Sequence, residues 1–127
     1  MSCCDNTTTT LSVAIDELIV GDHVQTSNAK LTTATAYARG DLLILSATNV
    51  LTLAIDPAIW DVISTFTFTA AEATARVAAG FEAPVYNQGE FNVALCSLGG
   101  VKLTAGAQQD QARAHGTIRN IELRKVV

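Results

Sequence analysis

Apolar and polar residues alternate in several short segments of the chain, which is the pattern of half-buried β-strands. The clearest segment is 62–69, in which Phe66 and Phe68 stand between threonines. In the last apolar segment, Ile121 and Leu123 would share one face of a strand. Strands are expected at 41–45, 51–55, 62–69, 81–86, 90–95 and 117–127.

Turn-forming residues separate these segments. Ser27-Asn28 predicts a turn within the mostly polar stretch 22–40. Asn87-Gln88-Gly89 predicts a hairpin connection, because glycine supplies the positive φ that such turns need. Pro84 cannot donate a backbone hydrogen bond, so the strand 81–86 is expected at a sheet edge or at a bulge.

The segment 69–80 predicts a short helix. Thr69 and Glu72 have the spacing of a capping box, Glu72 and Arg76 are four residues apart, and Gly80 is suited to end the helix. The segment is short enough for tertiary context to override this local preference.

The first 20 residues divide into two parts. Residues 1–10 are polar and low in complexity, whereas residues 11–20 are mainly apolar. Leu11, Val13 and Ile15 alternate as they would in a strand. Such a strand behind a polar leader would either pack on its own domain or bind a partner.

A second helix is expected at 105–115, followed by Gly116. Together these patterns predict a β-rich α+β fold: a small mixed β-sheet or barrel-like domain with one or two short helices. The 127 residues fit one domain, which we assign to 22–127, with an extended N-terminal arm at 1–21.

Composition narrows the classes of function. The net charge is −4 and the eight lysines and arginines form no cluster, which disfavours nucleic-acid binding. No apolar run is long enough to span a membrane, and the N-terminus has no signal-peptide pattern. Cys3, Cys4 and Cys96 have no zinc-type spacing and are expected as reduced thiols of a protein made in a cytoplasm.

Candidate catalytic groups are few and scattered. His23 and His115 are far apart in the sequence and are expected as surface histidines. Asp16, Glu17 and Asp110 are acidic, but no nucleophile or phosphate-binding motif accompanies them. We therefore expect no enzyme activity, no cofactor and no metal.

Two short motifs have simpler explanations. Arg39-Gly40-Asp41 spells an integrin-type tripeptide, but a turn before the strand at Leu42 explains it equally well. Asn6-Thr7-Thr8 spells a glycosylation acceptor, which matters only on a secretory route.

Three segments resemble the head decoration, or capsid cement, proteins of tailed bacteriophages, similar to the λ decoration protein. Residues 83–92 (APVYNQGEFN) resemble the strand, turn and Gly-Glu-Phe-Asn strand of that family. Residues 107–123 (AQQDQARAHGTIRNIEL) resemble its short helix and final strand, and residues 38–43 (ARGDLL) its first core strand. The resemblance covers about two thirds of the chain, from residue 39 onward.

The resemblance implies a trimer on the outer surface of an expanded capsid, with an N-terminal arm that adds a strand to a sheet of the major capsid protein. The arm residues implied in binding are Leu11, Ser12, Val13, Ala14, Ile15, Leu18, Ile19 and Val20. The residues of the motif turn and strand are Tyr86, Gly89, Glu90, Phe91 and Asn92.

Two features depart from the family pattern. The arm is unusually apolar at 18–20, and 69–80 predicts a helix where the family has a linker between strands. Deleting residues 1–20 is expected to leave a folded domain that no longer binds capsids.

The expected function is therefore structural: a virion protein, synthesised in the host cytoplasm, that stabilises the capsid against internal DNA pressure. The expected partners are the major capsid protein and further copies of this chain, with no nucleic acid or membrane. The alternatives are a tail or baseplate module, a carbohydrate-binding β module and an enzyme. The carbohydrate-binding reading needs an aromatic platform, for which the chain offers Trp60, two tyrosines and four phenylalanines, with Phe66 and Phe68 expected in the core.

Overall fold

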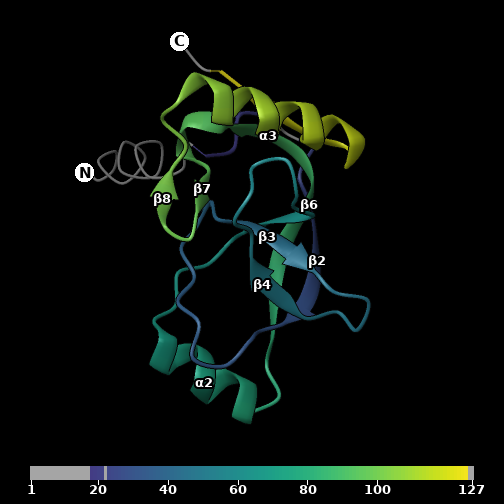
Figure 1. Ribbon diagram of the computed structural model, residues 1–127. Coiled ribbons are helices and arrows are strands. Elements are labelled where there is room, and N and C mark those ends of the chain that lie inside the picture. Colours follow the sequence, from purple (N-terminus) through teal and green to yellow (C-terminus); the bar gives the residue numbers. More distant parts are fainter. Residues whose placement is uncertain (1–17, 22, 126–127) are drawn as a thin grey trace, which may run out of the picture.

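The chain folds into a strand-rich α+β structure, which confirms the predicted fold class. The computed structural model describes residues 18–21 and 23–125 (Figure 1). The elements are β2 (Gln25–Lys30), β3 (Leu42–Leu45), β4 (Leu51–Leu53), β5 (Val62–Ser64), α2 (Ala70–Ala78), β6 (Glu82–Asn92), the 3-10 helix η1 (Val93–Leu95), β7 (Ser97–Leu98), β8 (Val101–Lys102), α3 (Gly106–Ile118) and β9 (Ile121–Arg124). Neither described helix is long and apolar enough to cross a membrane.

Strand β6 is the longest strand and connects most of the main sheet. The order is β2-β6-β5-β3-β4, and β9 also pairs with β6. The first part of β6 lies between the antiparallel strands β2 and β5, and its last four residues pair with β9 in parallel. Strand β6 therefore changes its partners along its length, from β2 and β5 to β9.

The predicted hairpin at Asn87-Gln88-Gly89 is wrong, because these residues lie inside β6. Gln25 is opposite Gln88 and Thr26 is opposite Tyr86, which leaves Asn87 as a bulge. Gly89 follows with φ +145°, a conformation that residues with a side chain rarely adopt. The turn-forming residues thus bend the strand, at the place where it changes partners, instead of reversing it.

At Pro84, β6 pairs only with β2, because β5 pairs with β6 only at Val85 and Tyr86, so this position is a local sheet edge, as expected. Its pairing partner in β2 is Asn28. Its carbonyl oxygen accepts a bond of 2.7 Å from the Thr65 hydroxyl, just beyond the end of β5. The backbone N and C=O of a strand residue point to the same side of the strand. The Pro84 nitrogen, which has no hydrogen to donate, therefore points to the side where β5 has already ended, so no strand hydrogen bond is lost.

Ser27-Asn28 forms part of β2, so the predicted turn there is also wrong. The sequence of β2 is mostly polar and only Ala29 is fully buried. For this reason the strand has no alternation of apolar and polar residues by which the sequence could reveal it. At its end, Lys30 bridges to Val50 beside β4, and the Lys30 N–H donates to the Asn49 oxygen at 2.8 Å. This bridge links the chain at the ends of the two outer strands, β2 and β4.

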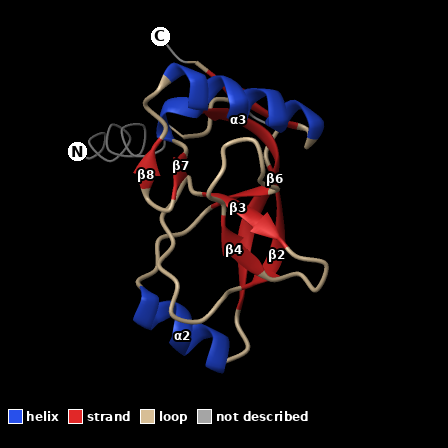
Figure 2. Cartoon of the chain, viewed as in Figure 1, coloured by secondary structure: helices blue, strands red, loops and turns tan. Residues whose placement is uncertain are grey.

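Both faces of the sheet are buried. Leu42 and Ile63 face a cluster beside α3, whereas their neighbours Leu43 and Val62 face a cluster beside α2. We call these the α3 cluster and the α2 cluster. The two helices lie at opposite ends of the molecule (Figures 1 and 2). Burial on both faces explains why these strands have continuous apolar runs instead of alternation.

The other strand predictions need smaller corrections. Strand β5 ends at Ser64, whose hydroxyl donates to the Phe66 carbonyl at 2.8 Å and so turns the chain. Phe66 and Phe68 are only partly buried, against the α2 cluster. Ile55 lies beyond β4 and is 89% exposed. Ile121 and Leu123 are both buried, as their spacing predicts.

Helix α2 confirms the local prediction for 69–80 over the family-based linker. The Thr69 hydroxyl accepts from the Glu72 N–H at 3.1 Å, and Glu72 accepts from the Thr69 N–H at 2.8 Å. The Arg76 guanidinium lies 4.4 Å from the centre of the Phe68 ring and 4.8 Å from that of Phe81. The capping box and this stacking hold the helix against the domain.

Helix α3 extends beyond its predicted end at 115 and includes Gly116. Gly116 is buried, and a Cβ there would collide with the Ile121 carbonyl and lie 3.3 Å from Trp60. Glycine is thus required for close packing of α3 on the domain, not for ending the helix.

We expect Thr69→Ala to lower the free energy of unfolding by about 1 kcal/mol, because the N-cap bond of α2 is lost. Urea denaturation followed by circular dichroism measures this change. The matched control is Thr104→Ala, at an exposed position outside the helices, which should change stability little. Equal effects of the two substitutions would contradict a stabilising role of the capping box.

Candidate functional site

The structure brings together two groups of predicted site residues, the end of the arm and the motif strand. Residues 18–20 lie antiparallel to the last part of β6, with Ile19 opposite Phe91. The Val20 N–H donates to the Glu90 oxygen at 3.0 Å, and the Asn92 N–H donates to the Leu18 oxygen at 2.7 Å. We call these six residues, Leu18–Val20 and Glu90–Asn92, the N-terminal anchor.

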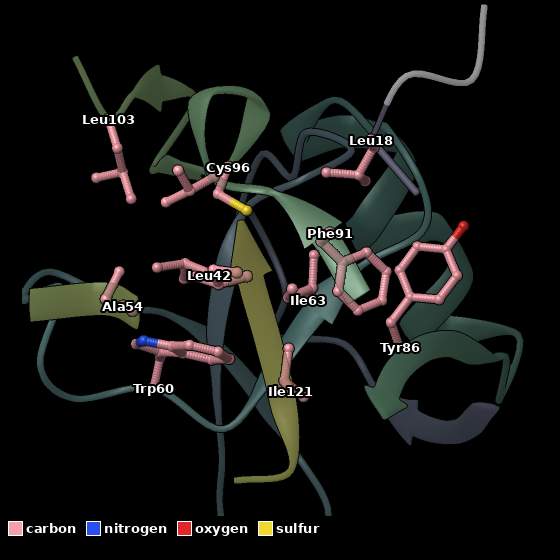
Figure 3. Packing of buried hydrophobic residues seen from close by; sticks show 13 residues of the cluster. Leu18, Leu42, Ala54, Trp60, Ile63, Tyr86, Phe91, Cys96, Leu103 and Ile121 are labelled. Carbon is pink, nitrogen blue, oxygen red and sulfur yellow. The ribbon is translucent and has the colours of Figure 1, made fainter. Parts of the chain in front are cut away.

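Leu18 belongs to the core of the domain. Its side chain is only 4% exposed and lies in the α3 cluster together with Phe91. Figure 3 shows the Tyr86 ring beside the Phe91 ring, with Leu18 above them in this view. Burial of Leu18 and two backbone hydrogen bonds therefore fix the point at which the N-terminal segment joins the domain.

Tyr86 and Gly89 both contact or closely approach the Phe91 ring of the anchor. The Tyr86 ring centre is 5.0 Å from that of Phe91, and its hydroxyl accepts from the Arg39 guanidinium at 2.8 Å. A Cβ at Gly89 would lie 3.1 Å from the Phe91 ring. These motif residues thus position Phe91, and the buried Tyr86 ring is not available to an external partner.

The polar groups of the anchor are also engaged within the protein. Glu90 pairs with Arg124 at 3.0 Å, and Arg124 pairs with Glu122 at 3.1 Å. The Asn92 side chain accepts from the Ala94 N–H at 3.1 Å and so caps η1. Because the ion pairs are half exposed, they orient side chains more than they stabilise the fold.

The predicted arm therefore extends too far into the domain. Leu18, Ile19 and Val20 contact β6 of their own chain, so the folded domain begins by Leu18 rather than at residue 22. Leu11, Ser12, Val13, Ala14 and Ile15 lie outside the described residues. A deletion of residues 1–20 would remove a core side chain, so 1–17 is the better deletion.

A polar cleft of about 450 Å³ opens beside the anchor, where β6 bends at Gly89. His23, Glu90, Arg113 and Glu122 are among its lining residues. The Arg113 guanidinium donates to the Leu123 oxygen at 3.0 Å, and both glutamates pair with Arg124. In the described ranges, no group of three or more His, Cys, Asp or Glu side chains could hold a metal ion.

Asp41 is a buried carboxylate that the sequence places at a turn and at the start of the strand 41–45, without predicting its burial. It is fully buried and accepts hydrogen bonds from the N–H groups of Ala38 and Gly100, at 2.9 and 2.8 Å, and from the Ser97 hydroxyl. It thereby joins the start of β3 to the β7–β8 hairpin. The only sign of this role in the sequence was an aspartate at the start of an apolar strand. Because the Asp41 carboxylate is buried, Arg39-Gly40-Asp41 offers no exposed carboxylate for adhesion.

His115 is not the surface histidine that the sequence predicts. It is partly buried, and its Nε2 atom lies 2.6 Å from the Trp60 oxygen. Trp60, Tyr37 and Tyr86 are all buried, so none of them supplies the aromatic platform of a carbohydrate-binding module. Asp110 is exposed and pairs with Arg113 and Lys125, while Asp16 and Glu17 lie outside the described residues.

No protein-family model, curated protein or solved structure matches the chain.

We expect Leu18→Ala to lower the free energy of unfolding by about 2–5 kcal/mol, because it leaves a cavity in the α3 cluster. Chemical denaturation of the full chain measures this loss. Val101→Ala is the control, since Val101 is 71% exposed and its truncation should cost little. An unchanged stability for Leu18→Ala would show that residues 18–20 are not part of the folded domain in solution.

Cys96 provides a chemical test of the same core. The thiol is fully buried, and burial raises its pKa from 9.0 to about 12, against an opposing effect of Lys102. At pH 8 it stays protonated and inaccessible, so iodoacetamide should modify Cys96 only in the denatured chain. Peptide mass spectrometry locates the label, and equal labelling of Cys96 in native and denatured protein would contradict this core packing.

Proposed function

We propose that this protein is a bacteriophage capsid decoration protein, which binds the outer surface of the expanded capsid as a trimer. In this role it stabilises the shell against internal DNA pressure and catalyses no reaction. The observation that supports the proposal most is the N-terminal anchor. It joins the apolar segment Leu11–Ile15 to a rigid domain through the residues that resemble the decoration-protein motif.

The anchor gives the arm a defined reach. Two residues, Asp16 and Glu17, lie between Ile15 and Leu18, so the two positions are at most about 10 Å apart along an extended chain. A capsid-protein strand that pairs with Leu11–Ile15 must therefore lie close to the β6 end of the domain. Backbone hydrogen bonds would supply affinity, and Leu11, Val13 and Ile15 would supply fit on one face.

A trimer binds the shell more tightly than a single copy, even if each copy makes no contact with the capsid other than through its arm. Once one arm has bound, the other two are held at high effective concentration near their sites. A protein that binds the assembled shell, and not its separated subunits, stabilises the shell by mass action. The partners are the major capsid protein and other copies of this chain, and the location is the outer surface of the virion head.

Co-sedimentation with shells of the phage that encodes the protein tests this function directly. We expect binding to expanded shells and not to unexpanded ones, at a saturating ratio that fits the three-fold positions. Absence of binding to either shell would overturn the proposal and would point to a tail or baseplate component instead.

Two deletions test the role of the arm. Removing residues 1–17 should abolish binding to expanded shells, because it removes Leu11–Ile15 and keeps Leu18 in the core. Removing residues 1–10 should preserve most binding, because the apolar segment remains. Equal binding by the 1–17 deletion and the full chain would show that the domain alone binds the shell.

A substitution within the full chain separates side-chain fit from arm length. Combining Leu11→Ser, Val13→Ser and Ile15→Ser keeps the length and removes the apolar face, so we expect shell binding to fall at least tenfold in the same assay. Thermal unfolding of each variant shows whether the domain is intact.

A further inference from the structure

Three exposed isoleucines lie at the α3 end of the molecule. Ile55 is 89% exposed and Ile59 is 57% exposed, both on the loop between β4 and β5. Ile118 is 74% exposed and lies near the C-terminal end of α3. Apolar side chains that gather on a surface commonly mark an interaction site.

The loop that carries Ile55 is held in place. The Trp60 oxygen lies 2.6 Å from His115 Nε2, and Asp61 pairs with Arg119 at 2.9 Å, so the loop is fastened to α3 on either side of Ile118. Within the loop, the Asp56 side chain accepts from the Ala58 N–H at 2.8 Å. These bonds restrain the loop after Ile55, and a restrained loop loses less entropy on binding.

An apolar cavity of about 300 Å³ lies at the α2 end. Its apolar lining comes from Leu31, Val50, Val77 and Phe81. Leu31 belongs to the α2 cluster, and Val77 and Phe81 pack against it, so the cavity opens directly onto the core. It is large enough for an isoleucine side chain.

Ile55 cannot fill the cavity of its own chain. Val50 precedes β4 and Ile55 follows it, so the two residues lie beyond opposite ends of this strand. Five residues of extended chain correspond to a separation of roughly 15 Å. Helices α2 and α3 are likewise at opposite ends of the molecule (Figure 1). We propose that a second copy of this chain inserts Ile55 into the cavity, so that copies associate head to tail.

Charges beside the two surfaces favour this pairing. Asp56 follows Ile55 and is exposed. Lys30 and Glu82 line the cavity, and Arg76 lies over Phe81 in its wall, which gives the cavity side one excess positive charge among these groups. The acidic residue of one copy therefore approaches a positive rim on the next, which helps to orient the encounter.

The contact is heterologous, since it joins two different surfaces, and such contacts close into rings when the rotation between copies allows it. Only the number of copies, three, rests on the proposed function. The contact between Ile55 and the cavity rests on the domain itself and involves neither the arm nor the capsid.

Light scattering after size-exclusion chromatography, without shells, tests the contact. We expect the full chain to have three times the mass of one chain, and Ile55→Lys to have the mass of a single chain. Val101→Lys is the matched control, because Val101 is also exposed but lies on the β7–β8 hairpin. A monomeric wild type at all concentrations, or Ile55→Lys that assembles like the wild type, would overturn the proposal.

Mixing two variants tests the head-to-tail arrangement. Val77→Lys blocks the cavity and keeps Ile55, whereas Ile55→Lys keeps the cavity. Each should be monomeric alone, and together they should form a heterodimer through the one remaining pair of surfaces. Thermal unfolding shows whether each variant is folded. If Val77→Lys does not fold, Val50→Lys is used in its place to block the cavity. A mixture of folded variants that stays monomeric would contradict the contact. Shell binding is measured separately, so the failure of either proposal can be distinguished.

Discussion

Strand β6 pairs with four other segments of the chain, and these pairings organise the molecule. Strands β2 and β5 pair with its first part, while β9 and residues 18–20 pair with its last part. A buried backbone group without a partner is costly, so each half of β6 fixes the place of a distant segment of the chain. The first described residues and the last described strand thus meet on the same three residues, Glu90–Asn92.

The change of partners requires a bend, and the residues at the bend are suited to it. Asn87 forms the bulge and Gly89 has a positive φ, so the second half of β6 is directed towards the α3 cluster. Phe91 then packs against Tyr86, in the same cluster as Leu18 (Figure 3). The segment that resembles the decoration-protein motif therefore acts mainly by holding the N-terminal anchor, and binding is assigned to what precedes Leu18.

The two proposals use different parts of one rigid domain. In the first proposal the anchor at β6 directs the arm towards the capsid, and in the second Ile55 and the cavity beside α2 join neighbouring copies. Because these surfaces are separate, arm variants should leave self-association unchanged, and variants at Ile55 should weaken shell binding only through the loss of linked arms. Assembly and attachment can then be varied independently.

The sequence alone determined features that depend on neighbouring residues. The capping box of α2, the shared face of Ile121 and Leu123, the core strand after Asp41 and the α+β class all follow from local spacing. Only the tertiary structure decided how turn-forming residues are used. Ser27-Asn28 is part of a strand and Asn87-Gly89 a bend, because β2 and β6 pair with each other across more than fifty residues of sequence. Burial of Leu18, Asp41 and Trp60 likewise depends on contacts with segments far away in the chain, which no local pattern records.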